Sequence, residues 1–325
     1  MRMTRRALVL GAVAAPIFIR NQLAHAQSWP SGVIRIVVPF PPGGTVDPIA
    51  RIAQPGLQQR LGATIIIENR PGASGSAGAA AVAKSAPDGN TWLFVFDTHA
   101  VNPFLQNLPF DTEKDLAPVV LIGTASNVLA THPSRPFKTF ADVAAAAKQK
   151  PDTLTYASVG SGSVGHLTMV QLCKQAGIRM VHVPYRGGGP AMNDAIAGHV
   201  DLIIGSAALV TPQVSAGMIR PILQTGKTPM LSLSTVPTAI DSGFAGFESY
   251  AWWGVFAPAG TPQPIIERFG SALTETLREP EISKRISETL QVTMLLGGPD
   301  EERKFLKAQM ELWGPVVIEN NIKGE

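Results

Sequence analysis

Three loops in this sequence combine glycine with hydroxyl, aromatic or charged side chains, and each lies between an expected strand and an expected helix. The first loop, residues 39–46, follows the β-branched run Val33–Val38. Asp47 as N-cap and Pro48 at the first helical position predict the start of the helix. Backbone N–H groups and the positive end of the helix dipole meet in such a loop. Because the loop pairs no nucleophile with a base, the expected chemistry is binding of a carboxylate-type anion.

The second loop, Gly160–Gly165, matches the pattern G-x-G-x-x-G and also stands between an expected strand and an expected helix. Dinucleotide binding would require an acidic residue about 20 positions further on. The strand expected there ends in Val183–Arg186, which has no carboxylate. We therefore expect a binding loop at a helix N-terminus. The hydroxyl groups on offer are those of Ser158, Ser161 and Ser163.

The third loop lies in Tyr185–Asp194 and repeats the design of the first, with a helix expected to start at Pro190. Arg186 could pair with a ligand carboxylate, although a solvated role is equally consistent with the sequence. Phe40 could form a wall of the ligand site or belong to the core, and His166 could contact the ligand or serve in packing. Two further candidates follow the strand expected over residues 92–96, because ligands bind at the carboxyl ends of such strands. They are Asp97 and Thr98.

Several other classes of site are disfavoured by residue type and spacing. No serine stands in G-x-S-x-G, so the sequence lacks the nucleophile elbow of a hydrolase. The histidines are widely spaced and the single cysteine, Cys173, has no cysteine partner, so neither a metal site nor an intramolecular disulfide is expected. We expect no cofactor.

The first 26 residues have the pattern of a secretory signal peptide. Three arginines stand in Met1–Arg6, an apolar run covers Ala7–Ile19, and Ala24–Ala26 supplies an A-x-A cleavage signal. The pair Arg5-Arg6 fits a twin-arginine signal as well as a Sec signal. Removing this segment and its four arginines leaves 23 basic against 24 acidic residues. The mature chain is therefore expected in the periplasm, without the clustered basic surface of a nucleic-acid-binding protein.

The remaining chain of about 300 residues predicts an α/β fold in two lobes. Strands and helices alternate from Val33 to about residue 223, which indicates mostly parallel sheets flanked by helices. The C-terminal helices are expected to pack back on the first lobe, so the chain would cross between lobes near residues 124–130 and 248–256. The predicted lobes are 27–127 with 249–325, and 128–248. Such a hinged clamshell holds its ligand between the lobes.

Four segments resemble one known family: Pro39–Arg51, Glu68–Gly72, Ala86–Gly89 and Val183–Ala191. In order and over the mature chain they are similar to the Bug family, the TctC-type extracytoplasmic solute receptors of tripartite tricarboxylate transporters. The resemblance implies a type II periplasmic-binding-protein fold, in which two loops hold a carboxylate like a pincer, partly through water. The site residues it implies are Phe40, Pro42, Gly43, Gly44 and Thr45 in the first loop, Ser161, Gly162 and Ser163 in the second, and Arg186, Gly187, Gly188 and Gly189 in the third.

The expected function is capture of a small organic acid and its delivery to a membrane permease, by a monomer that performs no catalysis. Two alternatives stay open from the sequence: an exported enzyme acting on small acids, and a ligand-sensing module that presents its closed form to a sensor kinase. The resemblance leaves the acid itself unnamed. One departure from the family pattern is Pro55-Gly56, which is expected to kink or split the first helix. A second is Gly189, where many relatives carry a bulkier residue.

Overall fold

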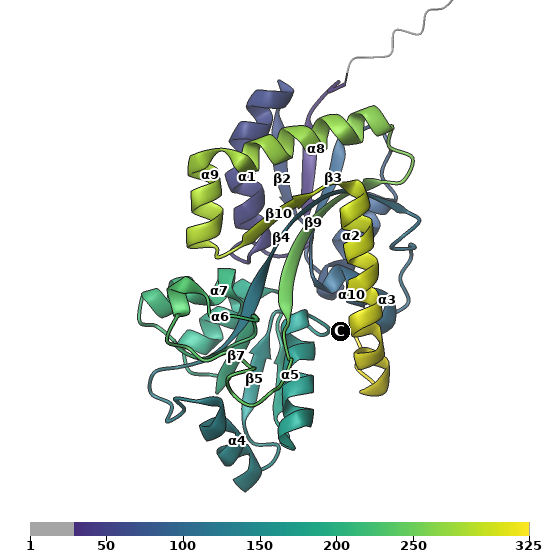
Figure 1. Cartoon of the computed structure of the whole chain (residues 1–325). Coiled ribbons are helices and arrows are strands. Elements are labelled where there is room, and N and C mark those ends of the chain that lie inside the picture. The colour runs from purple at the N-terminus through teal and green to yellow at the C-terminus, as the bar shows by residue number, and fades with distance from the viewer. Residues whose placement is uncertain (1–28, 325) are drawn as a thin grey trace, which may run out of the picture.

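The computed structural model describes residues 29–324, so the predicted signal peptide lies outside the described residues. The first lobe is built on a sheet in which β2 (Ile65–Asn69), β1 (Ile34–Val38) and β3 (Thr91–Phe96) run parallel. β9 (Tyr250–Pro258) pairs antiparallel with β3, and the first half of β4 (Leu116–Thr131) pairs antiparallel with β9. β10 (Thr293–Gly297) pairs antiparallel with β4. This lobe is the upper part of the molecule in Figure 1.

Helices cover both faces of the first sheet. Along β1, Ile34, Ile36 and Val38 face α1 (Val46–Leu61) and α8 (Gln263–Arg278), whereas Val37 faces the opposite helices. This alternation is the period-two pattern of a strand buried on both sides. The opposite helices are α2 (Ser76–Ala83), α3 (Thr98–Leu105) and α10 (Pro299–Glu319), and the short α9 (Pro280–Lys284) follows α8.

The second lobe repeats the plan with fewer strands. Here β6 (Val181–Pro184), β5 (Thr155–Ser158) and β7 (Leu202–Ser206) are parallel. The second half of β4 is antiparallel to β7, and β8 (Arg220–Gln224) is antiparallel to β4. The helices are α4 (Phe140–Gln149), α5 (Val164–Ala176), α6 (Gly188–Ile196) and α7 (Ala207–Ser215). The predicted α/β fold in two lobes is thereby confirmed, with antiparallel strands added to the parallel ones.

Two long strands join the lobes. β4 pairs with β9 as far as Ser126 and with β7 and β8 from Asn127 onward, so a single strand belongs to both sheets. β9 enters the first sheet at Tyr250, opposite Ser126. Both strands pass through the waist of the molecule in Figure 1. We therefore propose two lobes. The first is 27–127 with 249–325 and the second is 128–248, because β4 changes from the first sheet to the second close to residue 127 and β9 enters the first sheet close to residue 249.

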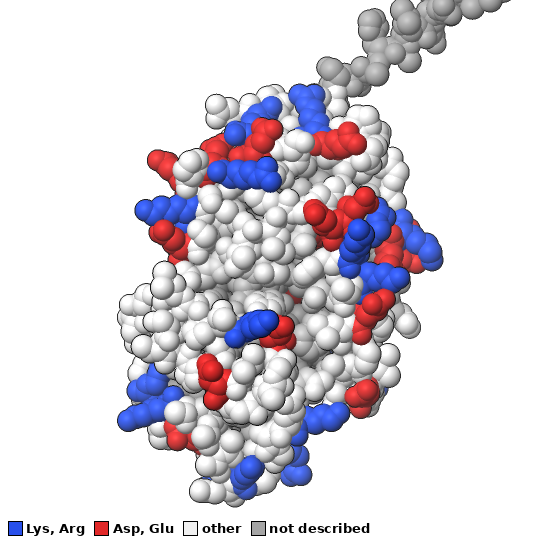
Figure 2. Space-filling model, in the orientation of Figure 1, with Lys and Arg blue, Asp and Glu red and all other residues white. Residues whose placement is uncertain are grey.

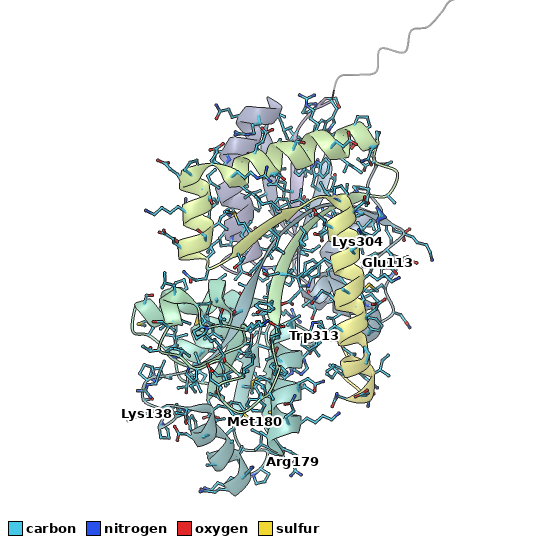
Figure 3. All side chains as sticks on the ribbon, viewed as in Figure 1. Glu113, Lys138, Arg179, Met180, Lys304 and Trp313 are labelled. Atoms are coloured by element: carbon cyan, nitrogen blue, oxygen red, sulfur yellow. The ribbon has the colours of Figure 1, made fainter. Side chains whose placement is uncertain are left out.

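The C-terminal helix α10 also reaches from one lobe to the other (Figure 1). Its second half packs on α3 of the first lobe and α5 of the second, and Trp313, labelled in Figure 3, lies at this junction. The junction is an apolar cluster of α3, α5 and α10, which ties the two lobes together on this side. Its buried members are Val101, Leu105, Val164, Leu167, Trp313, Val316 and Val317.

Of the predicted kink or split at Pro55-Gly56, the split was wrong, since α1 runs without interruption from Val46 to Leu61. A proline costs one helical hydrogen bond, but tertiary packing can compensate for that loss. Gly56 lies against α8, where a Cβ would stand only 2.6 Å from Cγ2 of Thr276. The N-cap is Thr45 rather than Asp47. The Asp47 carboxylate bonds instead to Arg51 at 2.9 Å and Asn69 at 3.0 Å.

Charge is evenly mixed on the face shown in Figure 2, where Lys and Arg alternate with Asp and Glu around α8, α9 and α10. This face therefore carries no extended basic patch of the kind that binds nucleic acid. Within residues 29–324, no helix is long and apolar enough to cross a membrane. Cys173 is half-buried, and burial raises the pKa of its thiol to about 11, which keeps the sulfur protonated and unreactive.

Candidate functional site

The first and third loops face each other across the gap between the lobes. A Cβ on Gly44 would lie 3.9 Å from the backbone N of Gly188, and a Cβ on Gly189 would lie 3.4 Å from the carbonyl oxygen of Pro42. Gly187 has a φ of +120°, and a Cβ there would also meet the ring of Pro41 at 3.1 Å. The glycines therefore let two backbone segments from different lobes approach within van der Waals contact.

A small cavity lies between these loops. The space open to the centres of water-sized molecules is about 20 Å³, which is room for about one water. A second cavity of about 10 Å³ adjoins it, because the side chains of Phe40 and Val159 line both. The first is lined by Phe40, Gly44, Thr45, Val46, Phe96, Val159, Gly187, Gly188 and Ser206. The second is lined by Pro39, Phe40, Gly72, Ala73, Ser74, Gly75, Val159, Tyr185 and Arg186.

Three helices begin at the first cavity. Its lining contains Thr45, Gly187 and Ser206, which are the N-caps of α1, α6 and α7, and none of them caps its helix through a side-chain hydrogen bond. The first N–H groups of a helix lack partners within the helix and carry the positive end of its dipole. The hydroxyl of Ser206 also has no hydrogen-bond partner within the described residues, although this residue is only 1 % exposed. One side of the cavity is thus lined by donors that lack acceptors within the described residues.

The other walls of this cavity are apolar. The ring of Phe96 lies 6.0 Å from that of Phe40 in an edge-to-face arrangement and 5.6 Å from that of Trp253. The indole N–H of Trp253 donates to the hydroxyl of Thr45 at 3.2 Å, which fixes the N-cap of α1 against the aromatic cluster. No Lys, Arg, His, Asp or Glu of residues 29–324 lines the cavity. A bound anion would therefore be held by uncharged donors, which are backbone N–H groups and the hydroxyl of Ser206.

The second cavity includes the only charged side chain in either lining, that of Arg186. Arg186 is exposed and forms no ion pair with any residue in the described range. Its neighbour Tyr185 donates its hydroxyl to Asp194 at 2.6 Å, and burial together with this bond raises the pKa of Tyr185 to about 12. This bond holds the third loop to the first turns of α6.

The second loop lies beside the cavities and bonds to the first lobe. The N–H of Val164 donates to Asp97 at 3.2 Å, and the hydroxyl of Ser74 donates to the carbonyl of Ser161 at 3.1 Å. Thr98 donates to the carbonyl of Ser74 at 2.8 Å. Burial raises the pKa of Asp97 well above its usual range. The bonds of Asp97 to Val164 and of Ser74 to Ser161 join the lobes. Six predicted site residues lie in this region and line neither cavity: Asp97, Thr98, Ser161, Gly162, Ser163 and His166.

A stacked pair of histidines supports the second loop from behind. The rings of His166 and His182 are 3.7 Å apart and nearly parallel, and Nδ1 of His166 accepts the N–H of Gly162 at 3.1 Å. Nε2 of His182 lies 2.7 Å from the hydroxyl of Ser158. Burial lowers the pKa of His166 to about 3 and that of His182 to about 4, so both rings are neutral at pH 7.

The buried histidines predict acid sensitivity. Burial also lowers the pKa of His99 to about 3, so each of three histidines binds a proton more readily in the unfolded chain, near pH 6.5. Their contribution to stability is complete above pH 6.5 and is lost as the pH falls toward 4. Each contributes a slope of up to about 1.4 kcal/mol per pH unit. We expect the unfolding free energy of His182→Gln, measured with urea, to fall less steeply with decreasing pH between 6.5 and 5 than that of the parent protein.

The control for this prediction is His199→Gln, because the side chain of His199 is solvent-exposed. Its pH profile should match that of the parent protein. A His182→Gln profile parallel to that of the parent would show that His182 does not contribute to the acid sensitivity.

Sequence reasoning singled out the first and third loops but missed Ser206, Phe96 and Val159. Ser206 ends β7 and begins α7, so it stands at the carboxyl end of a parallel strand, where the rule that selected Asp97 also applies. Its one glycine, Gly205, lies within the strand, and no loop residue separates β7 from α7, so the segment gave no loop signal. No cluster of His, Cys, Asp or Glu within residues 29–324 could hold a metal ion.

Comparison with known proteins places the chain in a family. The family model described as "Tripartite tricarboxylate transporter family receptor" matches residues 49–322. Protein BugT of Bordetella pertussis is 31 % identical over 331 residues, which cover 99 % of each chain. The solved structure of the periplasmic binding protein BugD has a TM-score of 0.86 at 28 % identity, covering 91 % of this chain and 99 % of that one.

A second solved structure, Rpa4515 from R. palustris with adipate, also has a TM-score of 0.86, at 30 % identity and with the same coverage. The resemblance predicted from the four sequence segments is confirmed by these matches. The chain belongs to the family of tripartite tricarboxylate transporter receptors, the TctC-type or Bug solute-binding proteins.

Proposed function

We propose that this receptor captures a small carboxylate-containing solute between its lobes and delivers it to the membrane permease of a tripartite tricarboxylate transporter. The observation that carries the proposal is the convergence of three uncapped helix N-termini on one cavity. Each N-terminus resembles about half a positive charge and stabilises an anion by about 0.3–1 kcal/mol, or more where water is excluded. The adipate in the structure of Rpa4515 supports a ligand of this class.

Solute entry requires the lobes to separate. The space between the first and third loops holds about one water, which is less than any organic acid needs. The joints available for this motion are β4, which pairs with strands of both sheets, and the segment that enters the first sheet as β9 at Tyr250. A solute that contacts both loops favours the closed form by its difference in affinity for the two forms. Closure also lowers the local dielectric, which strengthens each N–H contact to the carboxylate.

The proposed direct contacts are the residues of the two facing loops, and Ser206 joins them. For the predicted residues in and around the second loop, we propose contact with the solute only in the solute-bound form. Because Asp97 and Ser161 bond across the seam between the lobes, opening has to break these two bonds. The proposed contacts in the two facing loops are Phe40, Pro42, Gly43, Gly44, Thr45, Arg186, Gly187, Gly188 and Gly189. The proposed contacts in and around the second loop are Asp97, Thr98, Ser161, Gly162, Ser163 and His166.

We infer that the solute leaves unchanged. A serine–histidine pair near the cleft, Ser158 with His182, could suggest a nucleophile and its base. Ser158 is fully buried, its hydroxyl donates to the carbonyl of Gly160, and it lines neither cavity. The pair therefore supports the second loop and cannot reach a solute between the facing loops.

We propose that the chain is exported to the periplasm, cleaved near Ala26 and active as a monomer. The basis is the N-terminal sequence pattern together with the periplasmic neighbours. N-terminal sequencing of the periplasmic form should begin at or close to Gln27. A form that retains Met1 in the periplasmic fraction would contradict the cleavage.

The test of binding uses the mature chain, unfolded and refolded to remove any solute carried through purification. Thermal unfolding and calorimetry against mono-, di- and tricarboxylates should identify at least one acid that raises the melting temperature and binds with micromolar or better affinity. Proton NMR of the same mixtures should show no product. A folded protein that binds no carboxylate would overturn the proposal, and turnover of a bound acid would favour the exported enzyme.

A further inference from the structure

Resting on the proposed function, we propose that the preferred solute is a monocarboxylate with an apolar body, of which an aromatic acid is the best fit. The site thereby selects against dicarboxylates. The first cavity has a donor side and an apolar side, and the nearest lining cation belongs to the second cavity.

The donor side suits a single carboxylate. The N-termini of α1, α6 and α7 and the unpartnered hydroxyl of Ser206 are gathered on one cavity. A carboxylate has two oxygens with about four acceptor positions, and donors from three helices can satisfy them together. This arrangement accounts for Ser206, since a buried hydroxyl without a partner is rare in a folded protein.

The remaining wall offers nothing to a second charge. It consists of Val46, Val159 and the rings of Phe40 and Phe96, and Phe96 is held in place between Phe40 and Trp253. A second carboxylate against these groups would lose its water without gaining a partner. An aromatic ring would instead find edge-to-face partners of the same geometry that Phe40 and Phe96 already show.

The nearest lining cation lies beyond an apolar divide. Arg186 belongs to the second cavity, and the side chains of Phe40 and Val159 stand between the two cavities because they line both. Arg186 is also exposed, so its charge is screened by solvent. A dicarboxylate anchored at the three N-termini would have to pass Phe40 and Val159 to reach this guanidinium.

The experiment compares matched acids by calorimetry on the refolded, solute-free mature protein. The aromatic pair is benzoate and benzene-1,4-dicarboxylate, and the aliphatic pair is hexanoate and adipate. We expect each monoacid to bind at least tenfold more tightly than its diacid, and benzoate more tightly than hexanoate. Tighter binding of the diacid in both pairs would overturn the inference and leave the proposed function standing. Silence of a folded protein toward all carboxylates would overturn both.

Two variants test the two sides of the cavity. Ser206→Ala should weaken benzoate binding about tenfold, because one donor to the carboxylate is lost, whereas Ser215→Ala at the exposed end of α7 should not. Val159→Lys places a cation at the apolar divide and should shift preference toward benzene-1,4-dicarboxylate by at least tenfold. Equal affinity of the Ser206→Ala variant and the parent for benzoate would contradict the placement of the carboxylate. Thermal unfolding checks that each variant is folded.

Discussion

Replacing Gly44 with aspartate is expected to lower the affinity for a carboxylate solute at least a hundredfold. A Cβ at this position would stand 3.9 Å from the backbone N of Gly188, so the new carboxylate would lie among the helix N-termini that we assign to the solute. Two unit charges 4 Å apart repel by about 4 kcal/mol at an effective dielectric constant of 20. The variant would also occupy the anion site with its own side chain. Calorimetry with whichever acid binds the parent protein measures the effect.

The matched control is Gly44→Asn, which has nearly the same size and no charge. It should lose tenfold at most, so the gap between the two variants isolates the electrostatic contribution. Gly32→Asp adds the same charge at a position with no neighbouring atoms within 4 Å and should bind like the parent. If Gly44→Asp and Gly44→Asn weaken binding equally, steric exclusion explains the loss and the anion site is elsewhere.

Replacing Glu302 with glutamine is expected to stabilise the protein increasingly as the pH rises. Glu302 lies in the first turns of α10 and is fully buried, and neither carboxyl oxygen has a hydrogen-bond partner within the described residues. Its carboxyl group occupies the place that a Cβ on Gly254 of β9 would fill. Burial raises the pKa of Glu302 well above its usual range. The folded protein therefore keeps this side chain protonated while the unfolded chain ionises it.

The sign of the effect follows from proton binding. Below the ordinary carboxyl pKa both states are protonated and the substitution changes little. Above it only the unfolded state ionises, so the unfolding free energy of the parent falls by up to about 1.4 kcal/mol per pH unit until the folded-state pKa is reached. Glutamine has the same shape and cannot ionise, so this contribution to the slope disappears.

Urea unfolding at pH 5, 6.5 and 8 measures the difference between Glu302→Gln and the parent. The gap should be smallest at pH 5 and largest at pH 8. Glu311→Gln, on the exposed face of the same helix, should give the parent profile at all three values. Parallel curves for Glu302→Gln and the parent would mean that the carboxyl group is ionised in the folded protein.

Much of the architecture could be predicted because its signals are local. The β-branched run in β1, the glycines of the first and third loops and the alternation of strands and helices are set by backbone preferences over a few residues. These preferences place each helix N-terminus after a strand, and the rule for the carboxyl ends of parallel strands then predicts a binding cleft. The order of the four family segments added the class of receptor, which the comparisons confirm.

Other features required the tertiary structure. The sequence predicted a crossing between lobes near residues 124–130, but not that one strand, β4 (Leu116–Thr131), spans this crossing and belongs to both sheets. Its polar residues Ser126 and Asn127 interrupt the apolar pattern, but their backbone groups pair with strands that lie far away in sequence. In α1, likewise, Gly56 packs against α8 and the helix is not split, although the local sequence predicted a kink or a split.

By itself the sequence determined which segments form strands, loops and helices and which family the chain resembles, because both depend on residues close together in the chain. Only the tertiary structure decided that Ser206 joins Gly44 and Gly188 at one cavity, while Asp97 and Ser161 bond across the seam beside it. The reason is physical: a local pattern fixes the dihedral angles of a segment, but the meeting of three helix N-termini depends on how distant apolar faces pack.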